Sequence, residues 1–509
     1  MIEYPDLKHK YEKEDFEKLF NGPSDQPTFK SYFQKNSHGN FNPTVEVVGW
    51  YQAKNDYEYY GEKHGKNRAR ELVTEAIAAA DNDVDFSRFN NDNKGNIDGV
   101  MIVHSGPGAE EGGRKEYIWS HRSAISAKFV DGAFLQDYTI QPEVRVSTKG
   151  IVGIGIFCHE FGHLLGLPDL YDTDGTDDQH YGIGEWGLMG LGGWLGKEGH
   201  PAGMSAFSKE KLGWATVQAI NETGSYQLKP AHNNGNVYKI TTSNSNEYFL
   251  LENRQKQETD QYLNGSGLAV WHIDTERTNR YPESIHVNNR RDFKGVDLEE
   301  ADGQNDLDFR RNRGDEGDLF PGSSKRTEFG NESDPSSDLY EDQGKGLKSN
   351  VSITNIQLSN GIISFNYGTV EDNSGTSCEL AVKAQEGNNT LPKENYWYIF
   401  TLPQEGRLVV QDASASVYSD CDESSLLASS INNQLTTAWL AKGETVKIKL
   451  GDNQPTSLPS KWKLGIDNKK IDPALTVGTI AAKTYGNEPF DLNVSFQGDG
   501  KTSYQKVSG

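Results

Sequence analysis

Two histidines and a glutamate stand at a spacing that suits a metal-dependent hydrolase. They lie in the segment Cys158-His159-Glu160-Phe161-Gly162-His163. If this segment is helical, His159 and His163 project from one face, about 5–6 Å apart at their Cβ atoms. Two imidazoles so placed suit a tetrahedral zinc ion, with Glu160 beside them to take and return protons. The alternative is a pair of structural histidines in a protein core.

The residues after this segment offer a third ligand. Gly166 allows the chain to leave a helix with a positive φ, and Pro168 cannot continue the helix. The turn would bring Asp169 back toward the metal and leave a fourth position for water. Asp172 and Asp174 are rivals for this role, unless they belong to a solvated acidic loop. We therefore predict a zinc site formed by the two histidines and Asp169.

The elements that must position this site can be predicted from hydrophobic periodicity. Residues 154–165 form an apolar segment that predicts the helix of the two histidines. Residues 68–80 have apolar side chains at helical spacing, and residues 99–104 are typical of a buried strand. A further helix is predicted over 204–212. From about 225 to 368 the chain turns to short β runs, so the fold class is α+β.

The last part of the chain differs in kind. A polar stretch over 370–376 (VEDNSGT) predicts a linker. Beyond it, turn clusters separate β runs at a spacing that predicts an independent β-sandwich. These runs cover residues 397–402, 407–411, 445–450 and 462–466. We therefore predict a catalytic core over 1–224, a β-rich extension over 225–369 and a β-sandwich accessory domain over 377–509.

Composition excludes several classes of protein. The 509 residues carry a net charge of −23, which argues against nucleic acid and anionic membranes as partners. Aromatic residues make up 10% of the chain, too many for a mainly disordered protein. The longest apolar runs fall short of the roughly 18 residues that a membrane helix needs, so no transmembrane segment is predicted.

Three cysteines are too few for a dense disulfide framework in so long a chain. Cys378 and Cys421 could pair, or all three could be unlinked thiols. Cys158 stands beside the first histidine, but on a helix it points about 100° away from the ligand face. We expect it to be a buried core thiol and not a ligand.

The zinc motif resembles a known pattern. His159-Glu160-x-x-His163-x-x-Gly166-x-x-Asp169 resembles the extended zinc signature of the metzincin clan, with Asp as third ligand. Leu167-Pro168-Asp169-Leu170-Tyr171-Asp172 is similar to the end of this signature and its next residues in the immune inhibitor A family of secreted bacterial metallopeptidases. Trp186-Gly187-Leu188-Met189-Gly190 stands where that family has its Met-turn. Met189 would then form the floor under the zinc; the alternative is an ordinary core methionine.

The resemblance extends to roughly residues 1–368. It implies a metzincin-like fold and a secreted or cell-surface zinc endopeptidase in which Glu160 is the general base for a metal-activated water. We expect protein or peptide substrates and a monomer, with a signal peptide removed or outside this sequence. The further segments that carry the likeness are residues 84–89, 95–98, 248–255, 270–274, 296–303 and 317–322.

Calcium is a second expected cofactor. Residues 297–318 contain nine acidic side chains and only three arginines, and such a concentration of charge repels itself unless a cation neutralises part of it. Asp302, Asp315 and Asp318 are the candidate ligands; the alternative is a solvated loop. Residues 90–98 also have the outline of a calcium loop, but Lys94 occupies a ligand position.

A second function remains open. The protein could be a surface adhesin or matrix-binding protein with a structural or vestigial zinc site. Glu160 favours the enzyme, because a purely structural histidine site does not require it. The C-terminal β-sandwich would bind carbohydrate or protein, or serve as a stabilising appendage.

Overall fold

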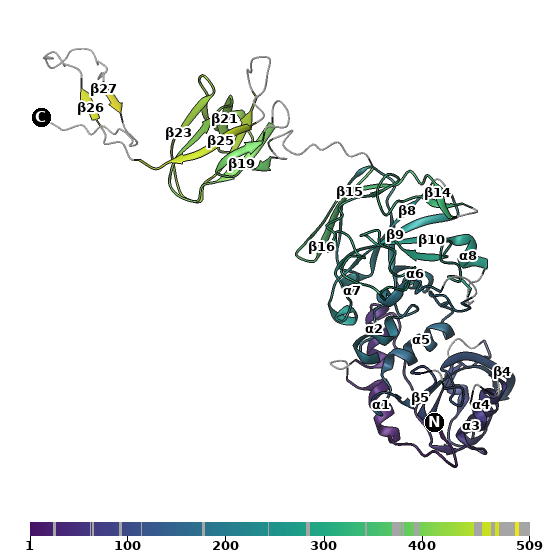
Figure 1. Ribbon diagram of the computed structural model, residues 1–509. Helices are drawn as coiled ribbons and strands as arrows, with labels where there is room; N and C mark the ends of the chain where they lie inside the picture. The colour runs from purple at the N-terminus through teal and green to yellow at the C-terminus, as the bar shows by residue number, and fades with distance from the viewer. Residues whose placement is uncertain are drawn as a thin grey trace, which may run out of the picture. The chain divides into compact units, whose positions relative to one another are not determined.

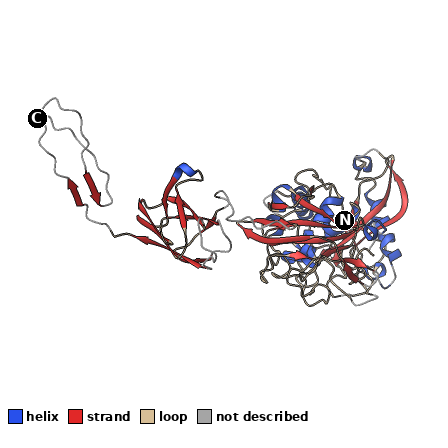
Figure 2. Ribbon diagram, turned by 90° about the horizontal axis from the view of Figure 1, so that it is seen from above, coloured by secondary structure: helices blue, strands red, loops and turns tan. Residues whose placement is uncertain are grey.

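The computed structural model divides into two compact units, residues 1–370 and residues 371–509. Figure 1 shows the course of the chain, and Figure 2 shows that helices gather in the N-terminal unit whereas strands dominate the C-terminal one. The predicted linker over 370–376 lies outside the described residues. The structure describes residues 1–23, 27–61, 63, 66–90, 94–112, 114–175, 179–242, 244–280, 286–341, 344–368, 378, 381–390, 396–451, 461–469, 474–477 and 494–497.

A mixed five-stranded sheet forms the frame of the N-terminal unit, in the order β2-β1-β3-β5-β4. Neighbouring strands run parallel to each other, with one exception: β4 runs antiparallel to β5 and forms one edge of the sheet. The strands are β1 (Ile2–Glu3), β2 (Tyr51–Gln52), β3 (Val100–Pro107), β4 (His121–Val130) and β5 (Ala133–Val144).

Helices cover both faces of this sheet. Successive side chains of a strand point to opposite faces, so one strand contributes to two cores. Ile102 of β3 packs in a core with the long helix α4 (Lys66–Ala80), and Val103 packs in the core that contains α5 (Ile154–Leu164). The predicted helix over 154–165 is thus confirmed to within one residue. The other helices of the unit are α1 (Lys13–Asn21), α2 (Phe29–Asn36), α3 (Tyr57–Tyr60), α6 (Ala206–Lys211), α7 (Ala231–Asn234) and α8 (Thr275–Arg280).

Two larger sheets, in the orders β11-β10-β9-β8-β6 and β12-β15-β16-β7, and the two-stranded sheet β13-β14 form the rest of the unit's described strands. The central strands β9 (Glu247–Arg254) and β10 (Gly267–Asp274) are buried along their whole length. Their alternate side chains enter two cores: Trp271 faces the core of α5, and Val270 faces the core between the two sheets. This β-rich part therefore shares a hydrophobic core with α5, the helix of the two histidines.

The remaining strands of the N-terminal unit are short and mostly antiparallel. They are β6 (Thr216–Ala219), β7 (Gly224–Leu228), β8 (Asn236–Thr241), β11 (Val296–Leu298), β12 (Phe329–Gly330), β13 (Leu339–Glu341), β14 (Gly344–Leu347), β15 (Ser352–Ser359) and β16 (Ile362–Tyr367). The fold is a mixed α+β one, as predicted, and the predicted boundary at 224 stays a prediction. None of the helices in the described part of the chain has the length and apolar character to span a bilayer.

The C-terminal unit has two main sheets around one core, in the orders β17-β19-β24-β21-β22 and β18-β25-β20-β23. Val446 and Ile448 of the first sheet pack with Leu408 and Trp462 of the second. The strands are β17 (Val382–Lys383), β18 (Gly387–Thr390), β19 (Tyr396–Thr401), β20 (Gly406–Gln411), β21 (Ala415–Tyr418), β22 (Leu426–Ser429), β23 (Gln434–Leu440), β24 (Thr445–Leu450) and β25 (Lys461–Asp467), followed by the pair β26 (Ala474–Val477) and β27 (Val494–Gln497).

The cysteines resolve the alternatives that the sequence left open. Cys378 and Cys421 form a disulfide in the C-terminal unit. Cys158 is a free thiol with no exposed surface in the core of the N-terminal unit, as predicted.

We predict that the disulfide stabilises only the C-terminal unit. The bond joins residues 43 positions apart, so Cys421→Ser should lower that unit's free energy of unfolding by about 2–4 kcal/mol, because the unfolded chain gains freedom. Differential scanning calorimetry of the full chain should show one of two transitions shifted. Cys158→Ser is the matched control and should lower the other transition. A single transition that both variants lower equally would contradict the prediction.

Candidate metal centre

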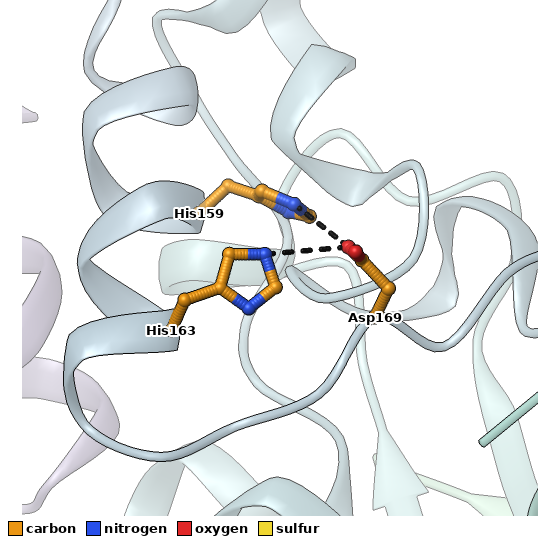
Figure 3. Close-up of side chains that lie close together, drawn as sticks. All are labelled: His159, His163 and Asp169. Atoms are coloured by element: carbon orange, nitrogen blue, oxygen red, sulfur yellow. Dashed lines mark hydrogen bonds and ion pairs between the residues drawn. The ribbon is translucent and has the colours of Figure 1, made fainter. Parts of the chain in front are cut away.

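The two predicted histidines and Asp169 converge in the structure (Figure 3). His159 and His163 lie one turn apart on α5, with ring centroids 5.0 Å apart and ring planes perpendicular. The Oδ1 atom of Asp169 lies 3.1 Å from Nε2 of His159 and 3.4 Å from Nε2 of His163. Ligands of a tetrahedral zinc ion, each about 2.05 Å from the metal, lie about 3.3 Å from one another. The two distances from Asp169 match this spacing, and all three candidate ligand atoms lie within 4.8 Å of one another.

The other nitrogen of each imidazole is held by a backbone carbonyl. Nδ1 of His159 lies 2.9 Å from the carbonyl oxygen of Leu188, and Nδ1 of His163 lies 2.8 Å from that of Leu167. A carbonyl only accepts hydrogen bonds, so each Nδ1 carries the proton. In the neutral imidazole, Nε2 then presents its lone pair toward Asp169. This is the arrangement in which histidines bind metals.

The turn after α5 brings Asp169 to the histidines. Gly166 has a φ of +88°, as the sequence predicted, and its N–H bonds to the carbonyl of His163. The next N–H, of Leu167, bonds to the carbonyl of Gly162, and so the helix ends within one turn of its second histidine. The N–H of Leu170 donates to the carbonyl of Met189, which holds the residue after Asp169 in place.

The electrostatics of the cluster call for a cation among its three members. Burial opposes the charged form of His163, yet Asp169 beside it raises the histidine's pKa to about 9. Burial also opposes the charge of Asp169, and the two histidines nevertheless bring the pKa of this carboxyl well below its usual range. In the metal-free protein a proton on the histidines offsets the negative charge of Asp169, and a divalent ion would offset it more fully.

The predicted Met-turn lies directly under this cluster. The carbonyl of Leu188 binds His159, and Met189 is buried with its Sδ atom against Gly162, where a Cβ would lie only 2.6 Å from the sulfur. Gly162 directly precedes His163, so any larger side chain there would displace the sulfur or the helix. The methionine thus packs against the helix that carries both histidines.

Glu160 projects from the same helix but does not join the three converging residues. Its side chain is buried, and burial raises the pKa of the carboxyl above its ordinary value. The sequence did not reveal Glu110, a partly buried carboxyl whose pKa is also raised, by desolvation and by the charge of Glu160. Glu110 comes after strand β3 and accepts the backbone N–H of Ser120, and no pattern around it marked it as part of the site.

The rivals for the third ligand position lie elsewhere. Asp172 caps its own turn by accepting the N–H groups of Asp174 and Gly175, and Asp174 binds the side chain of Asn289. Tyr171 lies near the first histidine, with its ring centroid 6.2 Å from that of His159.

A second group of potential ligands lies in the acidic segment. Glu300, Asp302 and Asp318 bring carboxylate oxygens within 4.8 Å of one another. Two of the three predicted residues are thus together, but Glu300 joins them where Asp315 was expected. Asp315 binds the side chain of Asn312 and the N–H of Gly317. Glu300 escaped prediction because nine acids compete in this segment and only the fold selects among them.

Burial makes this second group unusual. It raises the pKa of Glu300 to about 9, with help from the nearby charge of Asp318, and it raises the pKa of Asp318 to about 7. The Oδ1 atom of Asp318 is buried without a hydrogen-bond partner. In the other predicted loop, over 90–98, Asp92 lies outside the described residues and Asn90 accepts the N–H of Gly95.

Comparison with known proteins identifies the class of this site. Residues 4–218 match the family model described as immune inhibitor A peptidase M6, catalytic domain. This match supports a metallopeptidase. Residues 4–218 are thus similar to the catalytic domain of the immune inhibitor A family, the family that the motif pattern resembles. The family model ends at residue 218, and the likeness of residues 219–368 to the family stays a prediction.

Two curated relatives agree with this assignment. Immune inhibitor A of Bacillus thuringiensis subsp. alesti is 33% identical over 261 residues, which are 39% of this chain and 36% of that protein. The pre-pro-metalloprotease PrtV of Vibrio cholerae serotype O1 (strain M66-2) is 33% identical over 241 residues, 38% of this chain and 25% of that protein. The chain thus spans about a third and a quarter of the lengths of these relatives.

We predict a distinctive pH dependence for the metal-free protein. Because Asp169 raises the pKa of His163 from about 6.5 to about 9, their pairing stabilises the fold fully below pH 6.5. This contribution is lost as pH rises toward 9. Urea unfolding at a series of pH values should therefore show stability falling across this window, and Asp169→Asn should flatten the fall. Asp174→Asn, the exposed rival, should behave like the wild type. Equal slopes in all three proteins would contradict the assignment.

Proposed function

We propose that the protein is a zinc endopeptidase that hydrolyses internal peptide bonds, with His159, His163 and Asp169 as the zinc ligands. One observation carries the proposal: one carboxylate oxygen lies 3.1 and 3.4 Å from the two Nε2 atoms, while backbone carbonyls hold both Nδ1 atoms. A zinc ion in this position supplies Lewis-acid chemistry and lowers the pKa of water.

Glu160 is the general base in this proposal. It lies next to the first ligand on α5 and is not consumed by the ligand cluster. Burial raises its pKa, so the carboxylate holds an abstracted proton better than an exposed glutamate would. The same carboxyl then returns the proton to the leaving amine. The backbone N–H of Arg122, on edge strand β4, also interacts with this carboxylate.

The finer features of the proposal rest on the family likeness. We assign the turn of Met189 as a metzincin Met-turn, and we take the two-sheet C-terminal unit as a β-sandwich accessory domain that binds carbohydrate or protein, or stabilises the enzyme. Secretion or display at the cell surface and action on protein substrates are part of the same proposal. They fit relatives named as an immune inhibitor and a metalloprotease.

We predict that Glu160→Gln abolishes proteolysis without loss of zinc. The change removes the proton acceptor and should lower casein turnover by a factor of about 10²–10⁴. Zinc content should stay near that of the wild type, because the glutamate is outside the ligand cluster. Glu198→Gln is the control, a buried glutamate whose carboxylate faces the N–H of Gly153 before the same helix.

The result also separates the enzyme from a surface adhesin. Undiminished casein turnover in the Glu160→Gln variant would refute the role of Glu160. A wild-type protein that binds zinc and glycans but cleaves no protein would favour the adhesin with a structural or vestigial zinc site.

We further propose that Glu300, Asp302 and Asp318 bind Ca²⁺. Calcium takes carboxylate oxygens at 2.3–2.6 Å, so oxygens on opposite sides of the ion lie about 5 Å apart, which fits the observed cluster. Asp318 supports the assignment most directly, because its Oδ1 is buried without a hydrogen-bond partner. A bound cation would let these buried carboxyls ionise together.

We predict that calcium stabilises the N-terminal unit through this cluster. At a hundredfold excess of Ca²⁺ over its Kd, the unit should gain about 2.7 kcal/mol, seen as a raised Tm. Asp318→Asn should remove most of this gain. Glu316→Gln, an exposed acid of the same loop, should retain it. A gain that survives Asp318→Asn would place the calcium elsewhere.

A further inference from the structure

Trp186 is the first residue of the turn that contains Met189, and both its carbonyl and its indole N–H are held by side chains. The guanidinium Nη1 of Arg254 donates to the Trp186 carbonyl at 2.7 Å, and the indole N–H of Trp186 donates to Asp318 at 2.7 Å. Two residues further on, the carbonyl of Leu188 lies 2.9 Å from Nδ1 of His159. Arg254 is thus one hydrogen bond and two residues away from the carbonyl that orients a proposed zinc ligand.

Arg254 is rigidly placed. It ends strand β9 with no exposed surface in its side chain. Its Nε and Nη2 atoms donate to the two carboxylate oxygens of Asp260 at 2.7 and 2.6 Å, and Glu252 lies 3.5 Å from Nη1. A guanidinium presents its donors in a planar fork, so a two-point grip on one side fixes the direction of the N–H groups on the other side. The bond to Trp186 therefore has a set length and direction.

We propose that Arg254 is a positioning residue for the zinc centre. By holding the Trp186 carbonyl it fixes the turn whose Leu188 carbonyl selects the tautomer and orientation of His159. Groups that hydrogen-bond a metal ligand, as the Leu188 carbonyl would, change metal affinity or activity by 10–100-fold when they are altered, and Arg254 acts on that carbonyl through the turn. This inference rests on the proposed zinc function and assigns a role in it to the β-rich part of the N-terminal unit.

The competing explanation is that Arg254 only balances buried charge. It belongs to a buried network with Asp260, Glu252 and Lys209, and Lys209 donates to Glu252 at 3.0 Å. Loss of either cation leaves a buried carboxylate less compensated, and both losses should destabilise the fold. The bond from Arg254 to the Trp186 carbonyl distinguishes the two cations. Lys209 therefore provides the matched control.

The test compares Arg254→Lys with Lys209→Met in the full chain. Four quantities are measured: the Kd for zinc by chelator competition, the visible spectrum of the cobalt-substituted protein, kcat and KM on a peptide, and the stability in urea. Lysine keeps the charge but cannot hold Asp260 and Trp186 in one plane. We expect Arg254→Lys to raise the zinc Kd by about 10–100-fold, shift the cobalt spectrum and lower kcat more than it changes KM. Lys209→Met should lose stability while its zinc Kd and cobalt spectrum stay those of the wild type.

Several results would overturn the inference. A folded Arg254→Lys protein with the zinc Kd and cobalt spectrum of the wild type would do so. So would a loss of zinc affinity in both variants that parallels their loss of stability. If Arg254→Lys does not fold, Asp260→Asn loosens the grip on the guanidinium with little change of shape, and it should give an intermediate zinc Kd. A folded Asp260→Asn protein with unchanged zinc affinity would refute the role. A wild-type protein that binds no zinc would instead refute the proposed function itself.

Discussion

The site depends on one buried carboxylate facing two imidazoles. Asp169 is almost fully removed from solvent, and a charge placed there is costly unless something nearby compensates it. The histidines compensate it at 3.1 and 3.4 Å, and only at these short distances does the attraction outweigh the loss of hydration. The groups around the three side chains hold them at these distances.

Backbone groups provide most of this support. The chain leaves α5 at Gly166, and the carbonyl of Leu167 then reaches back to His163. The turn that begins at Trp186 supplies the carbonyl for His159 and packs Met189 under the helix. These groups have little side-chain freedom to lose, so the ring orientations are fixed at low entropic cost. The β-rich part of the unit contributes by holding this turn from its far side through Arg254.

The sequence predicted the parts of the site that are local and missed those that are not. His159 and His163 could be predicted from helical spacing, and Asp169 from a turn only a few residues long, so short-range geometry was sufficient. Arg254 and Trp186 are 68 residues apart, and no periodicity links them. Glu300 became part of its cluster, and Glu110 came near Glu160, only through the packing of separate segments. Likewise, the spacing of Cys378 and Cys421 left open whether they pair, and the fold of the C-terminal unit decided it.

The buried acids of the N-terminal unit differ in how their charge is compensated. Several buried acids of the N-terminal unit have a cation beside them: Asp260 has Arg254, Glu252 has Lys209, and Asp297 has Lys294. Such pairs keep the local charge near zero and need no ligand. Glu300 and Asp318 differ, because burial and the charges of neighbouring carboxylates raise the pKa of both. The cluster of Glu300, Asp302 and Asp318 would need a cation from outside to offset its charge in the same way. Since Asp318 also accepts the indole N–H of Trp186, an ion in the cluster would be linked through this hydrogen bond to the turn that supports His159.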